Sequence, residues 1–338
     1  MAALMMRAIV IAESGGPEVL ELRSVERPAP REREVLVRVR ATALNRADLL
    51  QREGKYPAPR GFPADIPGIE FAGEVAALGE GASQWARGDR VFGITGGGAY
   101  AEYLCAHEGT LARIPDALDF TAAAAVPEAF ITAHDALMQA EMRPADTVLV
   151  HAAGSGVGLA AIQLIRRFGG VPFGTARHES KIAAARACGL EAGEVMSASL
   201  AELEPAVAEW TGGRGMRIVL DLVGGAYTAA SMAVLSPRGC LVLIGTLAGA
   251  RTELPLSTVL RNRLMLRGTV LRSRSLEEKI VITQAFANHV VPLLQTGEVR
   301  PVIDATFPLA SAREAHLRMA SNDGAGKLVL IVGDGTGS

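Results

Sequence analysis

The stretch Thr147–Lys181, TVLVHAAGSGVGLAAIQLIRRFGGVPFGTARHESK, decides the fold. Its first residues, Thr147–His151, form a short apolar run with β-branched side chains, which predicts a buried strand. A turn of small residues follows, and then apolar side chains at helical spacing over residues 157–168, where two glycines end the segment. A second apolar run, Val171–Ala176, predicts another strand. This order of strand, turn, helix and strand predicts a βαβ unit of a parallel sheet.

The turn inside this unit reads Gly154-Ser155-Gly156-Val157-Gly158. Glycines at the start of a helix let the pyrophosphate of a dinucleotide approach bare backbone N–H groups. The spacing is not GxGxxG, and a turn that merely requires positive φ is the alternative interpretation. The strand and the helix on either side favour a dinucleotide site, with the five residues of the turn as its phosphate contacts.

The end of the second strand indicates which dinucleotide is bound. Sites for NAD usually place Asp or Glu there, to bind both ribose hydroxyls. This chain has Thr175 and Ala176 instead, followed by Arg177 and, one turn on, Lys181. Cations and hydroxyl groups suit a 2′-phosphate, so the pattern predicts NADPH, with Thr175, Arg177 and Lys181 as contacts. The alternative is that both cations are simply solvated surface charges.

Length and composition indicate the class of protein. The 338 residues are enough for two domains, and 49% hydrophobic with 21% charged residues describes a globular chain. A net charge of −2 is not the basic balance typical of nucleic-acid binding. Three scattered cysteines predict no disulfide framework and indicate a reducing compartment. We find no signal peptide and no apolar run long enough to span a bilayer, so we expect a cytoplasmic protein with a disordered tail at residues 333–338.

Alternating apolar residues and turn signals dominate the first hundred residues. Strands are predicted at residues 7–12, 18–24, 35–40, 69–78, 90–94 and 99–105, and a helix at residues 45–52. Val35, Val37 and Val39 should face inward, and Gly73 should mark a bulge or a close backbone approach. We therefore expect a β-rich domain, a partly open barrel.

Strands alternate with helices over residues 124–270. Helices are predicted at 121–125, 129–140, 157–168 and 226–235, and further strands at 218–221, 240–245 and 264–270. Beyond them come an amphipathic helix at 276–295 and strands at 304–308 and 327–332 around a helix at 311–321. The fold class is therefore α/β, a doubly wound parallel sheet with a β-rich domain, and a cleft between the two domains is a common place for a small-molecule site.

The residues that carry chemistry include no recognisable metal site. None of the six histidines forms an i, i+4 pair or stands beside a cysteine, and the serine-hydrolase elbow Gly-x-Ser-x-Gly is absent. His151, just before the glycine turn, should hydrogen-bond within the sheet. The sequence predicts an enzyme without a catalytic metal.

Several motifs in order resemble one family. They are Asn45-Arg46-Ala47-Asp48, Gly54-Lys55-Tyr56-Pro57, Pro67–Gly73, Gly88–Val91, Gly98–Tyr103, His151–Gly158 and Asp221–Gly225. Together they resemble the medium-chain dehydrogenases/reductases and, within them, the zinc-independent, zeta-crystallin-like quinone oxidoreductases. Leu271-Arg272-Ser273-Arg274 resembles the subgroup induced by the tumour-suppressor pathway. The similarity covers about residues 6–332.

This resemblance implies a GroES-like catalytic domain, residues 1–123 and 271–338, and a Rossmann domain for NADPH, residues 124–270. It implies that Asn45, Asp48 and Tyr56 line the substrate site and that Thr132 lies near the nicotinamide. Gly245 and Lys327 are further candidates for cofactor contacts. Zinc-dependent relatives carry cysteine where Asn45 stands and histidine where Ile69 stands, which agrees with the missing metal site.

Two positions depart from the family pattern. A second tyrosine of the substrate site falls on Leu50, so we expect a more apolar pocket here. A tyrosine that helps to hold the 2′-phosphate falls on Met196, and Arg177 or His178 would have to compensate for it.

The predicted function is reduction of quinones by NADPH, since a quinone accepts hydride with the help of only one or two hydrogen-bond donors. Tyr56 and Asn45 are the expected donors, and Asp48 is expected to orient its neighbours. The alternatives are reduction of activated C=C bonds in 2-alkenals, enones or enoyl thioesters, and a role in RNA binding or as a structural crystallin. We also expect a homodimer formed through the apolar strand 264–270, unless the helix 276–295 covers that edge.

Overall fold

The structure is a computed structural model that describes residues 4–196 and 200–333. The chain divides into two compact units, Met1–Ile131 with Leu271–Ser338 (unit 1) and Thr132–Val270 (unit 2). The division predicted from the sequence put the first junction at residue 124, before the helix α3 (Pro127–Gln139) that runs through residue 131. The tail predicted at residues 333–338 lies outside the described residues except for Gly333.

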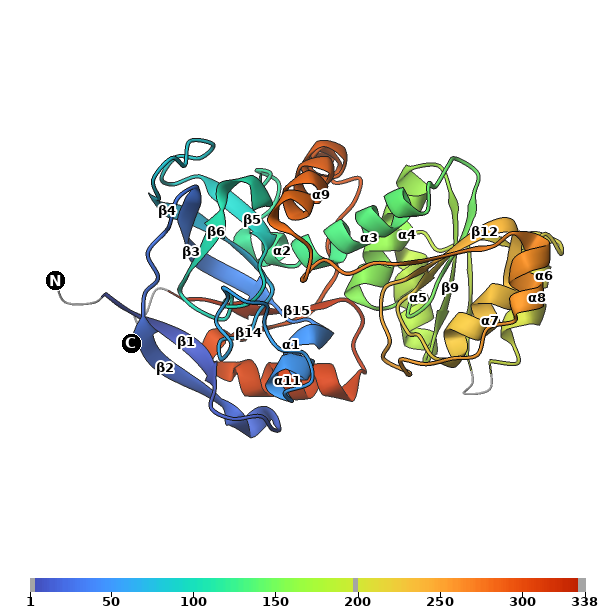
Figure 1. The fold of residues 1–338 in the computed structure, drawn as a ribbon, viewed down its shortest axis with the longest axis horizontal. Helices are drawn as coiled ribbons and strands as arrows, with labels where there is room; N and C mark the ends of the chain where they lie inside the picture. The colour runs from blue at the N-terminus through green and yellow to red at the C-terminus, as the bar shows by residue number, and fades with distance from the viewer. Residues whose placement is uncertain (1–3, 197–199, 334–338) are drawn as a thin grey trace. The chain divides into compact units, whose positions relative to one another are not determined.

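Unit 2 contains a parallel six-stranded sheet in the order β10-β9-β8-β11-β12-β13, seen edge-on in Figure 1. Its strands are β8 (Thr147–Val150), β9 (Val171–Ala176), β10 (Ala192–Val195), β11 (Met216–Asp221), β12 (Leu235–Leu243) and β13 (Met265–Gly268). Its helices are α4 (Gly156–Arg167), α5 (Glu179–Ala187), α6 (Leu203–Thr211), α7 (Ala226–Val234) and α8 (Leu256–Asn262). The strand order reverses beside β8, which is where doubly wound sheets bind ligands.

Unit 1 is mainly β-structure. Six strands of its main sheet follow the order β14-β15-β3-β4-β5-β7, and the seventh strand, β6, pairs with β3. β1 and β2 form a separate hairpin. The strands are β1 (Met5–Ile11), β2 (Leu20–Glu26), β3 (Glu34–Ala43), β4 (Glu70–Leu78), β5 (Arg90–Ile94), β6 (Tyr103–His107), β7 (Leu111–Arg113), β14 (Ile303–Pro308) and β15 (Lys327–Ile331). The helices are α1 (Arg46–Arg52), α2 (Phe120–Ala124), α9 (Leu276–His289), α10 (Val291–Thr296) and α11 (Ala312–Ser321), with short 3₁₀ turns η1 (Pro17–Val19), η2 (Glu108–Thr110) and η3 (Leu309–Ser311). The fold class predicted from the sequence is confirmed.

Two features of strands β3 and β4 follow directly from the sequence. Val35, Val37 and Val39 are buried, as their alternation predicts. Gly73 faces the backbone of β3 so closely that a Cβ there would lie 2.1 Å from the Arg38 carbonyl oxygen. The predicted close approach is confirmed, and it lets β4 pass across β3 at a register shift.

The last strand of the described chain, β15, lies inside this sheet, between β14 and β3. β15 pairs antiparallel with β3 and parallel with β14, so residues near both ends of the chain share one sheet. This pairing brings Lys327, the first residue of β15, to the end of β3, from which α1 begins. The candidate site of unit 1 depends on it.

Several predicted elements were wrong in their bounds. The helix expected at 276–295 is two helices, α9 and α10, because the ring of Pro292 cannot continue α9. The strand expected at 99–105 begins only at Tyr103, and Ala101 makes an isolated bridge to Ala8. Four elements of unit 2 were missed, α5, β10, α6 and α8, which are all short.

Candidate active site

The N-terminus of α1 carries the first of the predicted site residues. The carboxylate of Asp48 reaches back, and its Oδ2 accepts a hydrogen bond from the backbone N–H of Asn45 (2.8 Å). Its Oδ1 accepts one from the backbone N–H of Gly68 (3.2 Å), and Oδ2 another from the Tyr100 hydroxyl (3.2 Å). Asp48 is fully buried, and burial raises the pKa of its carboxyl to about 6 against the opposing effect of these hydrogen bonds. Asp48 thus connects the start of α1 to the backbone of Gly68 and to the side chain of Tyr100.

A chain of hydrogen bonds runs from Arg52 through His316 and Tyr100 to Asp48. Arg52 only donates, so its contact of 3.2 Å with His316 Nδ1 makes that nitrogen the acceptor and puts the ring proton on Nε2. His316 Nε2 then donates to the Tyr100 oxygen at 3.3 Å, which leaves the Tyr100 hydroxyl proton for Asp48. Burial lowers the pKa of His316 to about 3, so the imidazole is neutral.

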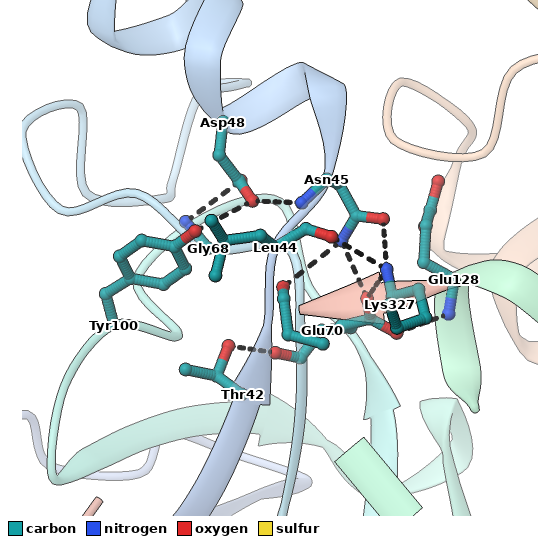
Figure 2. Close-up of polar contacts among 10 residues, drawn as sticks. Thr42, Leu44, Asn45, Asp48, Gly68, Glu70, Tyr100, Glu128 and Lys327 are labelled. Carbon is teal, nitrogen blue, oxygen red and sulfur yellow. Dashed lines mark hydrogen bonds and ion pairs between the residues drawn. The ribbon is translucent and has the colours of Figure 1, made fainter. Parts of the chain in front are cut away.

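Next to Asp48 lies a buried ion pair between Glu70 on β4 and Lys327 on β15 (Figure 2). Lys327 Nζ donates to Glu70 Oε1 (2.6 Å), to Asn45 Oδ1 (2.6 Å) and to the Leu44 carbonyl oxygen (2.8 Å). An ammonium group has three protons, and these three acceptors account for all of them. Lys327, predicted as a cofactor contact, therefore has its donors engaged inside unit 1.

Asn45 bridges the two partners of this ion pair. Its Oδ1 accepts from Lys327, while its Nδ2 donates to Glu70 Oε1 at 2.7 Å. The other oxygen of Glu70 accepts from the backbone N–H of Glu128 at 2.8 Å, at the start of α3. We call Asn45, Asp48, Glu70, Tyr100, Glu128 and Lys327 the buried polar cluster.

Glu128 differs from the other members of the buried polar cluster. Its Oε2 is buried and has no hydrogen-bond partner among the described residues. Burial raises the pKa of this carboxyl to about 8, and the negative charge of Glu70 adds to the effect. The carboxyl therefore holds its proton at neutral pH.

Tyr56, the third predicted substrate residue, lies under the guanidinium group of Arg272. The Arg272 Cζ is 4.9 Å from the centre of the Tyr56 ring, and its Nη1 donates to the Tyr56 carbonyl oxygen at 3.1 Å. Arg272 is held in turn by the Gly96 carbonyl oxygen (2.8 Å) and by the side chain of Gln51. Burial raises the pKa of the half-buried Tyr56. The charge of Arg272 lowers this pKa and that of Glu128 raises it, so the three groups lie within electrostatic range of one another.

In unit 2, the predicted phosphate turn joins β8 to α4. Ser155 is the N-cap of α4, and its Oγ accepts a hydrogen bond from the backbone N–H of Gly158 at 3.1 Å. The N–H groups of Gly156 and Val157, in the first turn of α4, have no acceptor within the helix. The turn therefore presents the donors that a pyrophosphate needs.

Close packing, rather than positive φ, explains two of the glycines. None of the three glycines of this turn has a positive φ, whereas Ala152, two residues before the turn, has a φ of 51°. A Cβ on Gly158 would lie 2.6 Å from the Ala152 carbonyl oxygen, and one on Gly154 would lie 2.6 Å from Lys181 Cβ. Lys181, which is nearly buried, thus packs directly against the turn.

The ends of neighbouring strands contribute the remaining predicted residues of unit 2. Thr175 on β9 is buried, and its hydroxyl is 2.7 Å from Nδ1 of His151, whose Nε2 is 2.7 Å from the Ser231 hydroxyl. This confirms the predicted role of His151 within the sheet, and it engages the Thr175 hydroxyl. Burial lowers the pKa of His151 to about 4.

Arg177 is exposed directly after β9, and Gly245 follows β12, where a Cβ would lie 2.6 Å from the Leu222 carbonyl oxygen. Thr132 on α3 is buried, and its Oγ1 has no hydrogen-bond partner among the described residues. β8, β9 and β12 run parallel, so Gly154, Arg177 and Gly245 all lie at the carboxyl ends of the strands.

Sequence reasoning missed four members of the site. Glu70, Tyr100 and Arg272 stand inside motifs that carry the family resemblance, but nothing in their local pattern assigns them a role. Glu128 lies just before the helix predicted at 129–140 and is a first-turn acid of α3 in the structure. The contacts of these residues become visible only in the folded chain, where four distant segments come together.

Residues 4–196 and 200–333 contain neither a metal-ligand cluster nor a membrane-spanning helix. No group of three His, Cys, Asp or Glu side chains in these residues is arranged to hold a metal ion. No helix there is both long and apolar enough to cross a membrane.

Comparison with known proteins identifies the family. Residues 31–116 match the alcohol dehydrogenase GroES-like domain, and residues 190–330 match the family described as zinc-binding dehydrogenase. The quinone oxidoreductase of Pseudomonas aeruginosa is 37% identical over 97% of this chain and 100% of its own length.

Solved structures agree. A quinone oxidoreductase of Pseudomonas syringae pv. tomato superimposes with a TM-score of 0.87 at 30% identity, over 97% of this chain and 100% of the other. A mycobacterial protein complexed with NADPH has a TM-score of 0.84 at 28% identity, over the same shares of the two chains. This chain therefore belongs to the quinone oxidoreductases of the medium-chain dehydrogenase/reductase superfamily and is an oxidoreductase of the kind that uses a nicotinamide cofactor.

Proposed function

We propose that this protein reduces quinones with NADPH. The observation that carries the substrate class is the match to a quinone oxidoreductase over 97% of this chain and 100% of the relative. The unit 1 site is compatible with it, because a half-buried phenol and a buried carboxyl holding its proton lie within electrostatic range of one guanidinium group. Such groups stabilise a developing oxyanion.

The preference for NADPH rests on the end of β9. Arg177 is exposed there, and the nearest carboxylate in sequence, Glu179, is paired with Arg186 at 2.7 Å rather than left open for ribose hydroxyls. Lys181 packs against the glycine turn one helical turn later. A 2′-phosphate placed beside Arg177 and Lys181 would gain charge-assisted hydrogen bonds that NADH lacks.

When bound, the reduced nicotinamide supplies the hydride, and the chain supplies positioning and charge stabilisation. Both polar atoms of the Asn45 side chain are engaged by Glu70 and Lys327. We therefore assign Asn45 and Asp48 to positioning and Tyr56 to direct donation. The Tyr56 hydroxyl would stabilise the substrate oxygen as negative charge develops on it.

The test is a matrix of cofactors and acceptors. Oxidation of NADPH and of NADH is followed with a panel of quinones and a panel of 2-alkenals and enones. We expect quinones to give the higher kcat/KM and NADPH to be preferred about tenfold, which is about 1.4 kcal/mol. Higher rates with enones would replace the quinone by an activated C=C bond as the substrate.

Tyr56→Phe tests the proposed donor. Loss of the hydroxyl should lower kcat and kcat/KM together by about tenfold or more, and most for the weakest oxidants among the quinones. Tyr103→Phe is the matched control, since this tyrosine packs under Arg27 elsewhere in unit 1. A Tyr56→Phe penalty that is constant across the quinone series would leave Tyr56 as a wall of the site without a role in charge stabilisation.

We also propose that activity needs no metal. The amide of Asn45 and the side chain of Ile69 occupy the positions where zinc-dependent relatives carry ligands, and Lys327 already places a cation against Asn45 and Glu70. Activity should survive chelators. Stoichiometric zinc in the purified protein, together with loss of activity on its removal, would contradict this.

The cytoplasm is the proposed location, supported by three cysteines that are all unpaired in the structure. Fractionation of cells that express the protein tests this, and recovery in a secreted or membrane fraction would contradict it.

Finally, we propose a homodimer formed through β13. This strand is the edge of the unit 2 sheet, with Leu266 45% exposed, and Leu256 (72%) and Leu260 (81%) are exposed on the preceding α8. The helix that was the alternative partner for this edge strand, α9, packs against β7 and η2 of unit 1. Leu266→Lys should lower the mass in sedimentation to one chain, while Leu317→Lys, at an exposed leucine of α11, should not.

A further inference from the structure

The carboxyl group of Glu128 stands out in unit 1, since its Oε2 is buried without a hydrogen-bond partner among the described residues. A buried polar atom without a partner costs free energy, so its position calls for an explanation. Figure 2 shows the carboxyl end of Glu128 turned away from Glu70 and Lys327, while its backbone N–H donates to Glu70. The side chain is thus not used to complete the ion pair beside it.

We propose that Glu128 is the acid that delivers a proton to the substrate oxygen, an inference that rests on the proposed reduction of quinones. In this step the acceptor gains a hydride, with its two electrons, from NADPH and becomes a hydroquinone anion. The O–H bond of Glu128 then breaks, a new O–H bond forms on the substrate oxygen, and the Glu128 carboxylate regains its proton from water. The sum is NADPH, quinone and one proton giving NADP⁺ and hydroquinone.

The surroundings of Glu128 explain why it can hold and release that proton. Burial and the charges of Glu70 and Asp48 raise the pKa of the carboxyl, while Lys327 and Arg272 lower it, with a result of about 8. The same cations, with the N-terminus of α3, stabilise the carboxylate after release. Tyr56 also lies within electrostatic range, since the charge of Glu128 raises its pKa.

Comparison of the candidate acids favours Glu128. A hydroquinone is a phenol, with a pKa near 10, so transfer from an acid of pKa about 8 to its anion is favourable by about two pKa units. Tyr56 has a pKa raised above the ordinary value of 10 and suits hydrogen bonding better than proton release. Asp48, with a pKa of about 6 and both oxygens hydrogen-bonded, is ionised at neutral pH. We therefore separate the two roles, Tyr56 as hydrogen-bond donor and Glu128 as proton donor.

The experiment compares Glu128→Gln, which keeps the size and polarity but holds no transferable proton, with Glu128→Asp, which keeps the proton. Glu314→Gln, at an exposed first-turn glutamate of α11, is the matched control. We expect kcat/KM of the parent protein to fall above pH 8. Glu128→Gln should lose about a hundredfold in rate and also lose this alkaline decline, and Glu128→Asp should recover part of both.

A second measurement needs no substrate. In an infrared titration of the ligand-free protein, a carbonyl band of a protonated carboxylic acid should persist at pH 7 and disappear near pH 8. The band should be present in Glu314→Gln and absent in Glu128→Gln. Unchanged thermal unfolding of the variants establishes that they are folded.

The outcomes separate the inference from the function on which it rests. A parent protein that oxidises NADPH with none of the quinones contradicts the proposed function, and the inference with it. A parent that is active, with a Glu128→Gln variant that keeps its rate and its alkaline decline, contradicts the inference alone. An infrared spectrum in which Glu128→Gln removes no band at pH 7 contradicts it as well.

Discussion

The buried polar cluster of unit 1 and the glycine turn of unit 2 prepare their sites in opposite ways. The cluster places ionisable side chains in the interior, where Glu70 and Lys327 meet at 2.6 Å. The turn has no ionisable side chain, and its donors are backbone N–H groups held by packing. The cluster depends on side-chain charge, and the turn depends on glycines that leave room for close packing. Different substitutions should therefore destabilise the two regions.

The largest effect should come from breaking the ion pair in the cluster. Lys327→Met leaves the Glu70 carboxylate buried without its cation, which should lower the free energy of unfolding by about 3–5 kcal/mol. Lys55→Met is the control, because Lys55 pairs with Glu53 at 2.9 Å but is 68% exposed, and its loss should cost less than about 1 kcal/mol. Urea unfolding measures both. Equal losses would mean that burial does not set the strength of the Glu70–Lys327 pair.

A buried histidine with a lowered pKa lies beside each region, His316 in unit 1 and His151 in unit 2, with pKa values of about 3 and about 4. The unfolded chain binds these protons near pH 6.5, so each histidine contributes stability that is complete above pH 6.5 and is lost as the pH falls towards its folded pKa. The loss should be on the order of a few kcal/mol for each histidine.

His316→Gln and His151→Gln should each flatten the dependence of unfolding free energy on pH between 6.5 and 4, and the exposed His178→Gln should not. The difference from the parent is the quantity to compare. Asp48 and Glu128, with raised pKa values, act in the opposite sense, because their contribution is lost as the pH rises. A pH dependence that neither buried-histidine variant changes would contradict the neutral state of the two imidazoles.

A smaller effect should follow from adding one methyl group to the glycine turn. Gly158→Ala would place a Cβ 2.6 Å from one backbone carbonyl oxygen and 2.8 Å from the next, and backbone atoms cannot move aside. We expect a loss of about 1–3 kcal/mol in stability and weaker NADPH binding. Gly268→Ala, where a Cβ would meet no atom within 4 Å, is the control and should bind NADPH normally. Fluorescence titration with NADPH would show the difference.

The smallest effect concerns Lys181, whose charge we expect to bind the 2′-phosphate of NADPH. Lys181→Ala should raise the KM for NADPH about tenfold and leave that for NADH nearly unchanged, because only NADPH carries the 2′-phosphate. Arg166→Ala, at a cation that pairs with Glu191 at 3.0 Å at the other end of α4, is the control. Equal increases for both cofactors would assign Lys181 to the shape of the turn alone.

The two regions also differ in how far the sequence predicts them. The glycine turn, its strands and its helix lie within 35 consecutive residues, and their local pattern predicts them well. His151 was placed correctly for the same reason, because its surroundings are set by the strand that it follows. Local patterns fail where segments are short or weakly periodic, as at α5 and β10, or where a proline divides a helix, as at Pro292.

The buried polar cluster was only partly predictable. Asn45 and Asp48 were found through family motifs, but Glu128 and the Glu70–Lys327 pair join segments that are far apart in the chain. Lys327 shows the limit clearly, since the sequence suggested a cofactor contact and the structure engages its three donors inside the protein. The spacing of residues in a single sequence does not predict a contact between two such distant positions.

The pairing of β15 with β3 has a consequence for synthesis on the ribosome. Unit 2, residues 132–270, is contiguous and is complete while β15 has still to be made. Unit 1 has to wait for Lys327 to emerge, because until then Ala41–Ala43 of β3 lack their β15 partners and Glu70 lacks its cation. The earliest-made part of the chain is thus the last to mature, and it is the part that a chaperone would encounter unfinished.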